Sequence, residues 1–70
     1  MLRDYEKGDV VRYDSRMMTP DLRPGLVVDV EYHVKPDDFL VYIMWPDAAR
    51  PQALFQKDCH SRGLRIVNCL

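Results

Sequence analysis

The chain has 70 residues, of which 47% are hydrophobic and 30% charged, and its formal net charge is −1. This length allows one domain, residues 1–70, near the lower size at which a core sustains a fold, and the composition is that of a globular protein and not of a disordered tail. The balanced charge lacks the basic excess that phosphate binding usually requires, so it lowers the expectation of nucleic-acid binding without excluding it.

Neither end of the chain carries a segment that indicates export or membrane insertion. The first residues hold no apolar stretch of signal-peptide length. The longest apolar run has seven residues, far short of the roughly 20 needed to cross a bilayer. The two cysteines, Cys59 and Cys69, suit free thiols in a reducing compartment at least as well as a disulfide. We therefore expect a cytoplasmic protein, or one incorporated in a particle assembled in the cytoplasm, with no membrane partner.

The first two strand patterns lie on either side of a long loop. Gly8-Asp9 precedes a strand pattern at 10–13, and the loop 14–24 separates this strand from 26–33. Within 26–33 the even positions are apolar and positions 29, 31 and 33 are polar, a period of two that is typical of a strand with one buried face. We therefore expect the even-numbered side chains of this strand to face the core.

The third strand pattern, residues 39–45, is apolar at all seven positions. Pro36 in the preceding segment 35–38 presets φ for a tight turn and predicts a hairpin between 26–33 and 39–45. Pro46 lacks the N–H that a ladder needs and ends the strand. A chain of this size builds its core on one face of such a strand, so the other apolar face is surplus to the core.

The rest of the chain predicts two short strands around one turn. Residues 52–56 and 64–67 have strand patterns, whereas 57–63 is too polar for a strand and too short for a helix, so it predicts a single 3₁₀ turn. Five short strands favour an all-β fold closed, or nearly closed, into a small barrel, because an open sheet would leave its edges unprotected.

Alternation along the strands separates an expected core from an expected interface. The predicted core residues are Val11, Leu26, Val28, Val30, Tyr32, Phe39, Val41, Ile43, Trp45, Phe55, Leu64 and Ile66. Leu40, Tyr42 and Met44 should then point outward, and contiguous exposed apolar surface usually marks a protein interface. We add Met17 and Met18 of the long loop to this predicted interface. In the alternative that stays open, this loop folds back and covers the outward side chains within the same chain.

The succession of motifs resembles the SH3-like small barrels, in the style of the KOW, Tudor and chromo-barrel domains. Gly8-Asp9 leads the first strand, Gly25 starts the second, and Trp45-Pro46-Asp47 ends the third with an acidic turn. The resemblance covers roughly residues 6–68 and extends to short stand-alone barrels encoded by tailed bacteriophages. It implies a five-stranded barrel with one short 3₁₀ turn before the last strand, and it implies no particular chemistry because small barrels host many activities.

The resemblance implies two possible kinds of binding site, but the residues of this chain give little support to either. An aromatic cage for methylated lysine or arginine would need Tyr32, Phe39 or Trp45, but these fall on the core side and no acidic residue is placed to complete a cage. A nucleic-acid surface could use basic residues together with a stacking Tyr13 or Tyr42. Its candidate basic residues are Arg12, Arg16, Arg23, Arg50, Lys57, Arg62 and Arg65. Acidic residues interleave with all of them, as on any soluble domain.

Metal binding and catalysis have no supporting motif. Cys59 and His60 are adjacent, whereas structural zinc ligands usually come in pairs two to four residues apart. Adjacent residues also point apart in an extended chain, so this pair does not form a nucleophile and its base. We expect no metal, no cofactor and no catalytic residue.

The sequence therefore predicts a non-enzymatic module for protein interaction or structure. The partner would be another protein or further copies of the chain, bound through the apolar outer face of 39–45. With the phage resemblance, the prediction extends to a bacteriophage virion accessory subunit associated with the head, connector or tail. The alternative is a KOW- or Tudor-like module that binds nucleic acid or regulates a host enzyme.

Overall fold

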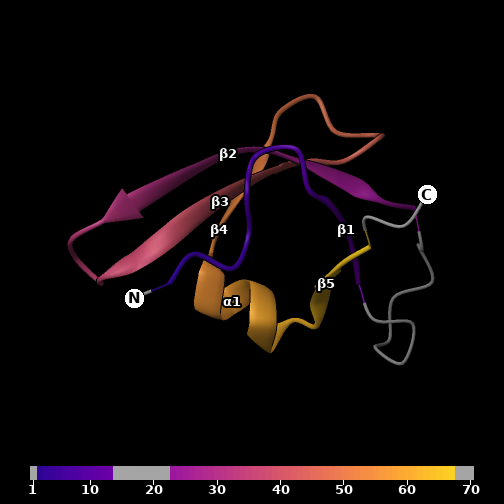
Figure 1. The fold of residues 1–70 in the computed structure, drawn as a ribbon. Helices are drawn as coiled ribbons and strands as arrows, with labels where there is room; N and C mark the ends of the chain where they lie inside the picture. Colours follow the sequence, from indigo (N-terminus) through magenta and orange to yellow (C-terminus); the bar gives the residue numbers. More distant parts are fainter. Residues whose placement is uncertain (1, 14–22, 68–70) are drawn as a thin grey trace.

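A computed structural model describes residues 2–13 and 23–67 of the chain. Five antiparallel strands form one sheet in the order β4-β3-β2-β1-β5, and one short helix lies between the last two strands (Figure 1). The elements are β1 (Val10–Tyr13), β2 (Gly25–His33), β3 (Asp38–Met44), β4 (Gln52–Phe55), α1 (Gln56–Ser61) and β5 (Leu64–Ile66). The mostly-β fold with five short strands is as the sequence predicts, and every strand lies within about a residue of its predicted bounds.

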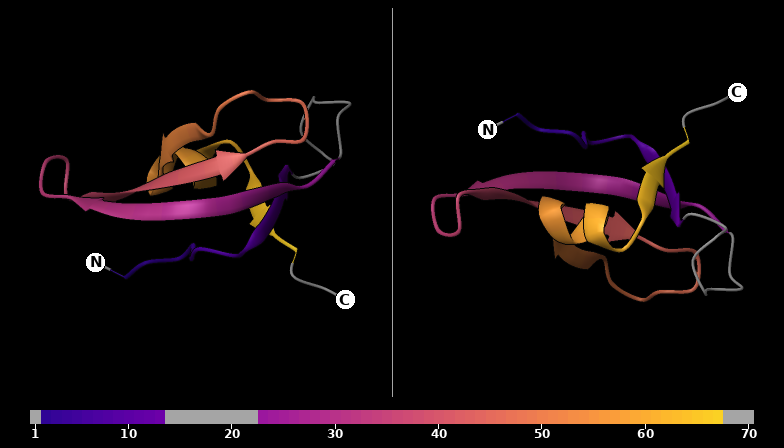
Figure 2. Two further views of the ribbon diagram at one scale, coloured as in Figure 1. Left: turned by 90° about the horizontal axis from the view of Figure 1, so that it is seen from above. Right: turned by 90° about the horizontal axis from the view of Figure 1, so that it is seen from below.

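The hairpin of β2 and β3 is the longest feature of the sheet. Its strands pair from Leu26↔Met44 at one end to His33↔Asp38 at the other. The connecting turn contains Pro36, as predicted, and Asp37, whose φ of 64° is a conformation that Asp tolerates better than most residues. The end of the hairpin projects beyond the other elements, which the two views in Figure 2 show from opposite sides.

A β-bulge interrupts the pairing of β2 with β3. Val27 pairs with Ile43 but Asp29 pairs with Tyr42, so Val28 is an extra residue with no partner on β3. One extra residue reverses the alternation of every side chain on one side of it. Val27 is therefore fully buried, whereas the strict period of two predicts burial of its neighbours.

The buried core lies on one face of the sheet, which we call the inner face. Its members come from the four longer strands, from α1, from β5 and from the segment before β1. They are Tyr5, Val11, Val27, Val41, Ile43, Leu54, Cys59 and Leu64, with Tyr13, Val30 and Trp45 packed against them. Four of the predicted core residues, Val11, Val41, Ile43 and Leu64, are thus among the buried ones.

Helix α1 replaces the predicted 3₁₀ turn, so that prediction is wrong. The Arg62 N–H donates to the Asp58 carbonyl at 2.9 Å, which is the four-residue spacing of an α-helix, and Gly63 ends the turn with a φ of 77°. Asp38 on β3 is buried, and its carboxylate accepts from the Lys57 N–H at 3.2 Å and from the Phe39 N–H at 2.8 Å. The sequence of 57–63 alone cannot predict this helix, because the carboxylate that caps it comes from another strand.

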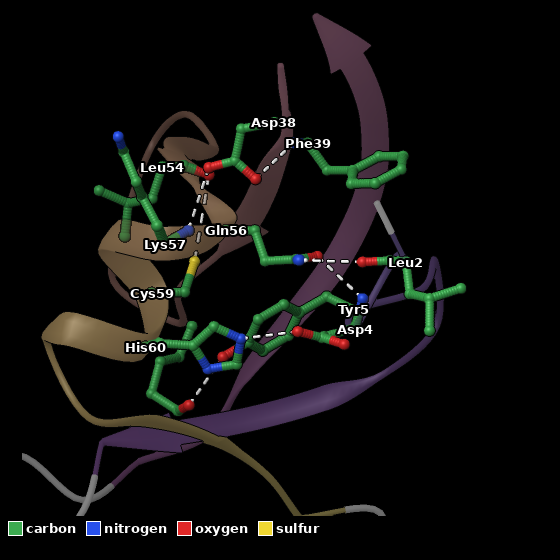
Figure 3. A network of polar contacts seen from close by, with 11 residues as sticks. Leu2, Asp4, Tyr5, Asp38, Phe39, Leu54, Gln56, Lys57, Cys59 and His60 are labelled. Carbon is green, nitrogen blue, oxygen red and sulfur yellow. Dashed lines mark hydrogen bonds and ion pairs between the residues drawn. The ribbon is translucent and has the colours of Figure 1, made fainter. Parts of the chain in front are cut away.

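Side chains of α1 hold the segment before β1 across the inner face (Figure 3). The buried Gln56 amide accepts from the Asp4 N–H at 2.8 Å and donates to the Leu2 carbonyl at 3.1 Å. His60 pairs with the Asp4 carboxylate at 2.8 Å. The buried Tyr5 hydroxyl donates to the Leu64 carbonyl at 2.8 Å. These bonds tie the first described residues to the last third of the chain, and α1 with this segment seals the core.

The sheet is not closed into a barrel in the part of the chain that the structure describes. β3 pairs with β4, β1 pairs with β5, and β4 and β5 remain the two edges of the sheet. Helix α1 packs against β3, β4 and β5 and so lies at the side where closure would occur. A barrel is expected from the sequence because an open sheet would leave its edges unprotected. A helix that covers this side protects them without pairing of β4 with β5.

Three predicted core residues are exposed, so their assignment to the core is wrong. Leu26 is 45% exposed because the bulge at Val28 places it on the face opposite the core. Tyr32 is 51% exposed because it lies on the hairpin beyond the end of the core, where it packs edge-on against Phe39. Ile66 is 41% exposed because β5 is an edge strand with a neighbour on one side only.

The remaining predicted core residues are half-buried. Val28 is the unpaired residue of the bulge. Phe55 pairs with Leu40, which places it on the face opposite the core, while its neighbour Leu54 takes the buried position. Phe39 is half-buried beside Tyr32.

Candidate functional site

The face of the sheet opposite the core, which we call the outer face, carries the apolar residues that the core does not use. Because Val41 and Ile43 are fully buried, their neighbours Leu40, Tyr42 and Met44 point to the outer face. All three are half-buried. The structure therefore places these predicted interface residues together, whereas Met17 and Met18 lie outside the described residues.

The ladders show which side chains accompany the β3 residues on this face. Met44 pairs with Leu26, and Leu26 pairs on its other side with Val10 of β1. These three residues form an apolar row across three strands, which we call the central row. Directly opposite residues on one face of a sheet lie within contact distance, so the row forms a continuous surface.

A pocket opens at the central row, at the end of the sheet away from the hairpin tip. Its lining residues are Val10, Pro24, Gly25, Leu26, Met44, Trp45, Pro46 and Ala48. None of them carries a charge, and most of the surface they offer is apolar. An apolar hollow with an exposed leucine at its rim suits an apolar side chain of a partner.

Gly25, one of the residues that line the pocket, packs closely against Trp45 and Ile43 on the inner face. A Cβ added to Gly25 would lie 2.7 Å from Cε3 of Trp45 and 2.8 Å from Cγ2 of Ile43. Trp45 is held on its other sides by a stacked Tyr13 ring, with centroids 5.4 Å apart, and by a bond from its Nε1 to the Gln52 side chain at 2.8 Å. The indole is therefore fixed in position before any partner binds.

On one side of the central row the outer face is acidic. Asp29 is opposite Tyr42, and Glu31 is opposite Leu40. The Glu31 carboxylate accepts from the Tyr42 hydroxyl at 3.0 Å and pairs with His33 Nε2 at 3.2 Å. The hydrogen bonds from His33 and then from Tyr42 lower the pKa of Glu31, and the bond to Glu31 raises the pKa of Tyr42. The Glu31 carboxylate therefore stays charged at neutral pH.

On the other side of the central row the outer face is basic. Val11 is fully buried, so Arg12 points to the outer face, as Val10 does. Arg12 is directly opposite Arg65 in the β1–β5 ladder, and both are exposed. This end of the outer face therefore carries two positive charges at opposed positions.

The remaining candidate residues are not assembled into a site. Cys59 is fully buried, and its burial raises the pKa of the thiol to about 11. His60 is on the surface and bonded to Asp4. Residues 2–13 and 23–67 contain no group of three or more metal-ligating side chains. Within the same residues no helix has the length and apolar character to cross a bilayer.

Leu26 is the surface residue that a reading of the sequence misses. A strict period of two places it with Val28 and Val30 in the core. The signal that could have found it is the run Leu26-Val27-Val28, in which three consecutive apolar residues break the alternation and indicate a bulge.

Comparison of the chain with protein-family models, with curated proteins and with solved structures finds no match.

Proposed function

We propose that this protein is a non-enzymatic interaction module that binds a protein partner through its outer face. The observation that carries the proposal is the central row, Val10, Leu26 and Met44, which continues into an uncharged pocket. Leu26 is 45% exposed in a chain that buries Val11, Val27 and Val41 completely. What distinguishes Leu26 is its place in a contiguous apolar row beside a pocket, and contiguous exposed apolar surface usually marks an interface.

Two surface substitutions test this proposal against a matched control. Leu26→Ser and Met44→Ser remove the apolar contacts of the central row, whereas Val34→Ser removes an exposed valine from the distant hairpin turn. We expect the two central-row variants to lose the protein that the wild type and Val34→Ser co-purify with from the native source. Circular dichroism checks that all variants are folded. Retention of the same partner by all four proteins would refute the proposal.

We also infer a relationship to the SH3-like small barrels. Five short antiparallel strands support it, since the resemblance implies five strands. The open sheet and the α-helix in place of a 3₁₀ turn depart from that pattern. Membership of a bacteriophage particle remains a prediction of that resemblance, and detection of the chain in purified virions by mass spectrometry tests it.

A second candidate function, binding to nucleic acid, is favoured by the Arg12–Arg65 pair. Arginines at opposed positions of a ladder place positive charge together, and Arg binds phosphate through two parallel hydrogen bonds. This function predicts an affinity for polynucleotides that falls steeply with salt concentration. Absence of a mobility shift at low salt would remove it.

A further inference from the structure

We propose that the partner on the outer face is a second copy of this chain, packed face to face about a two-fold axis that runs across the strands along Val10, Leu26 and Met44. This inference rests on the proposed function and names the partner of the same surface. It is carried by the distribution of charge on either side of the central row.

On the strands, the charged residues of the outer face form two groups of opposite sign. Arg23 and Asp47, which flank the pocket, form an ion pair with each other. The strands β2, β3 and β4 contain no lysine or arginine, and their charged residues on the outer face are Asp29 and Glu31. β1 and β5 carry Arg12 and Arg65 on that face. An apolar row with acidic residues on one side and basic residues on the other is complementary to itself after a rotation of 180°.

The spacing of the charges along the strands agrees with that rotation. Asp29 lies opposite Tyr42, two β3 residues beyond the Leu26↔Met44 pair, which corresponds to about 7 Å along the sheet. Arg12 lies two β1 residues beyond the Val10↔Leu26 pair in the opposite direction, which is again about 7 Å. A two-fold axis along the central row therefore brings Arg12 of each copy near Asp29 of the other. The neighbouring strands are about 4.8 Å apart, an offset that an arginine side chain spans.

The apolar part of the interface lies on the axis itself. Val10, Leu26 and Met44 meet their own counterparts there, and the exposed Leu26 lies beside the uncharged pocket of the partner. Stable interfaces bury about 800 Å² on each partner, which is about one sixth of the 5067 Å² surface of this chain. Two sheets packed face to face with strands inclined by about 30° bury surface of this kind.

A charge-swap experiment on the full chain tests the arrangement. Arg12→Asp and Asp29→Arg each turn two attractive contacts per dimer into repulsive ones. We expect each single variant to weaken dimerisation roughly tenfold or more, as measured by sedimentation equilibrium from low micromolar to near-millimolar concentration. The double variant restores the two contacts with exchanged signs, so its dissociation constant should return to within about threefold of the wild type.

Lys57→Glu provides the matched control, because it changes the net charge as Arg12→Asp does but lies on α1, away from the outer face. We expect it to leave dimerisation unchanged. A wild-type protein that stays monomeric at every concentration would overturn this inference, and so would a double variant that remains as weak as the single ones. Neither result affects the proposed function if Leu26→Ser still loses a different protein partner. A wild type that stays monomeric and binds a polynucleotide through Arg12 would overturn the inference in favour of the nucleic-acid function.

Discussion

The inner and outer faces of the β2–β3 hairpin hold similar amounts of apolar side chain but differ in what covers them. On the inner face, Val27, Val41 and Ile43 are fully buried in a core that also contains Cys59 of α1 and Tyr5 of the segment before β1. The polar groups there are also satisfied, since the described residues contain no buried side-chain nitrogen or oxygen without a partner. On the outer face, Leu26 remains exposed beside an open pocket.

The difference between the faces indicates which residues stabilise the fold and which are available to bind a partner. A side chain with partners on all sides contributes to folding, whereas an equally apolar one on the outer face contributes only when a partner covers it. Substitutions on the inner face should therefore change the free energy of unfolding, and those on the outer face should change association.

The largest effect is expected from neighbours of similar character on opposite faces of β3. Ile43→Ala removes a fully buried side chain and should lower the free energy of unfolding by about 2–5 kcal/mol. Met44→Ala, one residue away on the outer face, should cost about 1 kcal/mol or less. Urea unfolding at a concentration where the protein is monomeric measures both. Equal losses would show that the two faces do not differ as described.

An intermediate effect is expected at the position that links the two faces. Gly25→Ala places a methyl group against Trp45 and Ile43 and should cost about 1–3 kcal/mol by overpacking. Because Trp45 is the single tryptophan, its fluorescence should also shift in the folded state. Gly8→Ala is the control, since a Cβ there meets nothing within 4 Å, although its φ of 98° makes any side chain strained. An unshifted Trp45 spectrum in Gly25→Ala would contradict the close packing described for Gly25 and Trp45.

The smallest effect at neutral pH is expected from Tyr5 on the inner face. Tyr5→Phe removes the bond to the Leu64 carbonyl and should cost about 1 kcal/mol. Burial, with smaller contributions from Cys59 and Asp4, raises the pKa of Tyr5 from 10.0 to about 12. The folded state therefore holds this proton more tightly than the unfolded state. The resulting stability is complete below pH 10 and is lost as the pH rises toward 12.

The alkaline loss of stability separates Tyr5 from the neighbouring thiol. Cys59 contributes in the same direction, because its pKa rises from 9.0 to about 11. The Tyr5→Phe variant should retain the loss of stability that begins near pH 9, which comes from Cys59. It should lack the further loss that begins near pH 10, which comes from Tyr5. Denaturant unfolding measured across this range checks the result. Identical pH profiles for the variant and the wild type would exclude a buried Tyr5 proton.

Local patterns predict where this chain forms strands but not which face each side chain takes. The alternation in 26–33 is real, and Val30 packs on the core as expected. The extra residue at Val28 reverses the alternation for Leu26, and only pairing with β3 reveals the reversal. The helix at 56–61 was missed for a similar reason, since its cap, Asp38, comes from a distant strand.

The candidate site was predictable in part. Simple alternation along β3 predicts the outward positions of Leu40, Tyr42 and Met44, because this strand has no bulge. Its even-numbered residues lie on the face opposite to that of the buried Val41 and Ile43. Leu26 and the opposed positions of Arg12 and Asp29 depend on the registers of two ladders. Residues so far apart in the chain become neighbours only through pairing, and no local pattern encodes that register.

By itself, the sequence determined that this protein is a small, mostly-β chain with five short strands and more apolar surface than one core requires. Strand propensity, turn residues and hydrophobic content depend on only a few neighbouring residues, so the strands that they favour can be predicted from the sequence. Only the tertiary structure decided which apolar residues stay outside, because the bulge in β2 and the covering of one face by α1 and Tyr5 depend on contacts between distant segments. The exposed Leu26, on which the proposed function rests, is a product of that second kind of information.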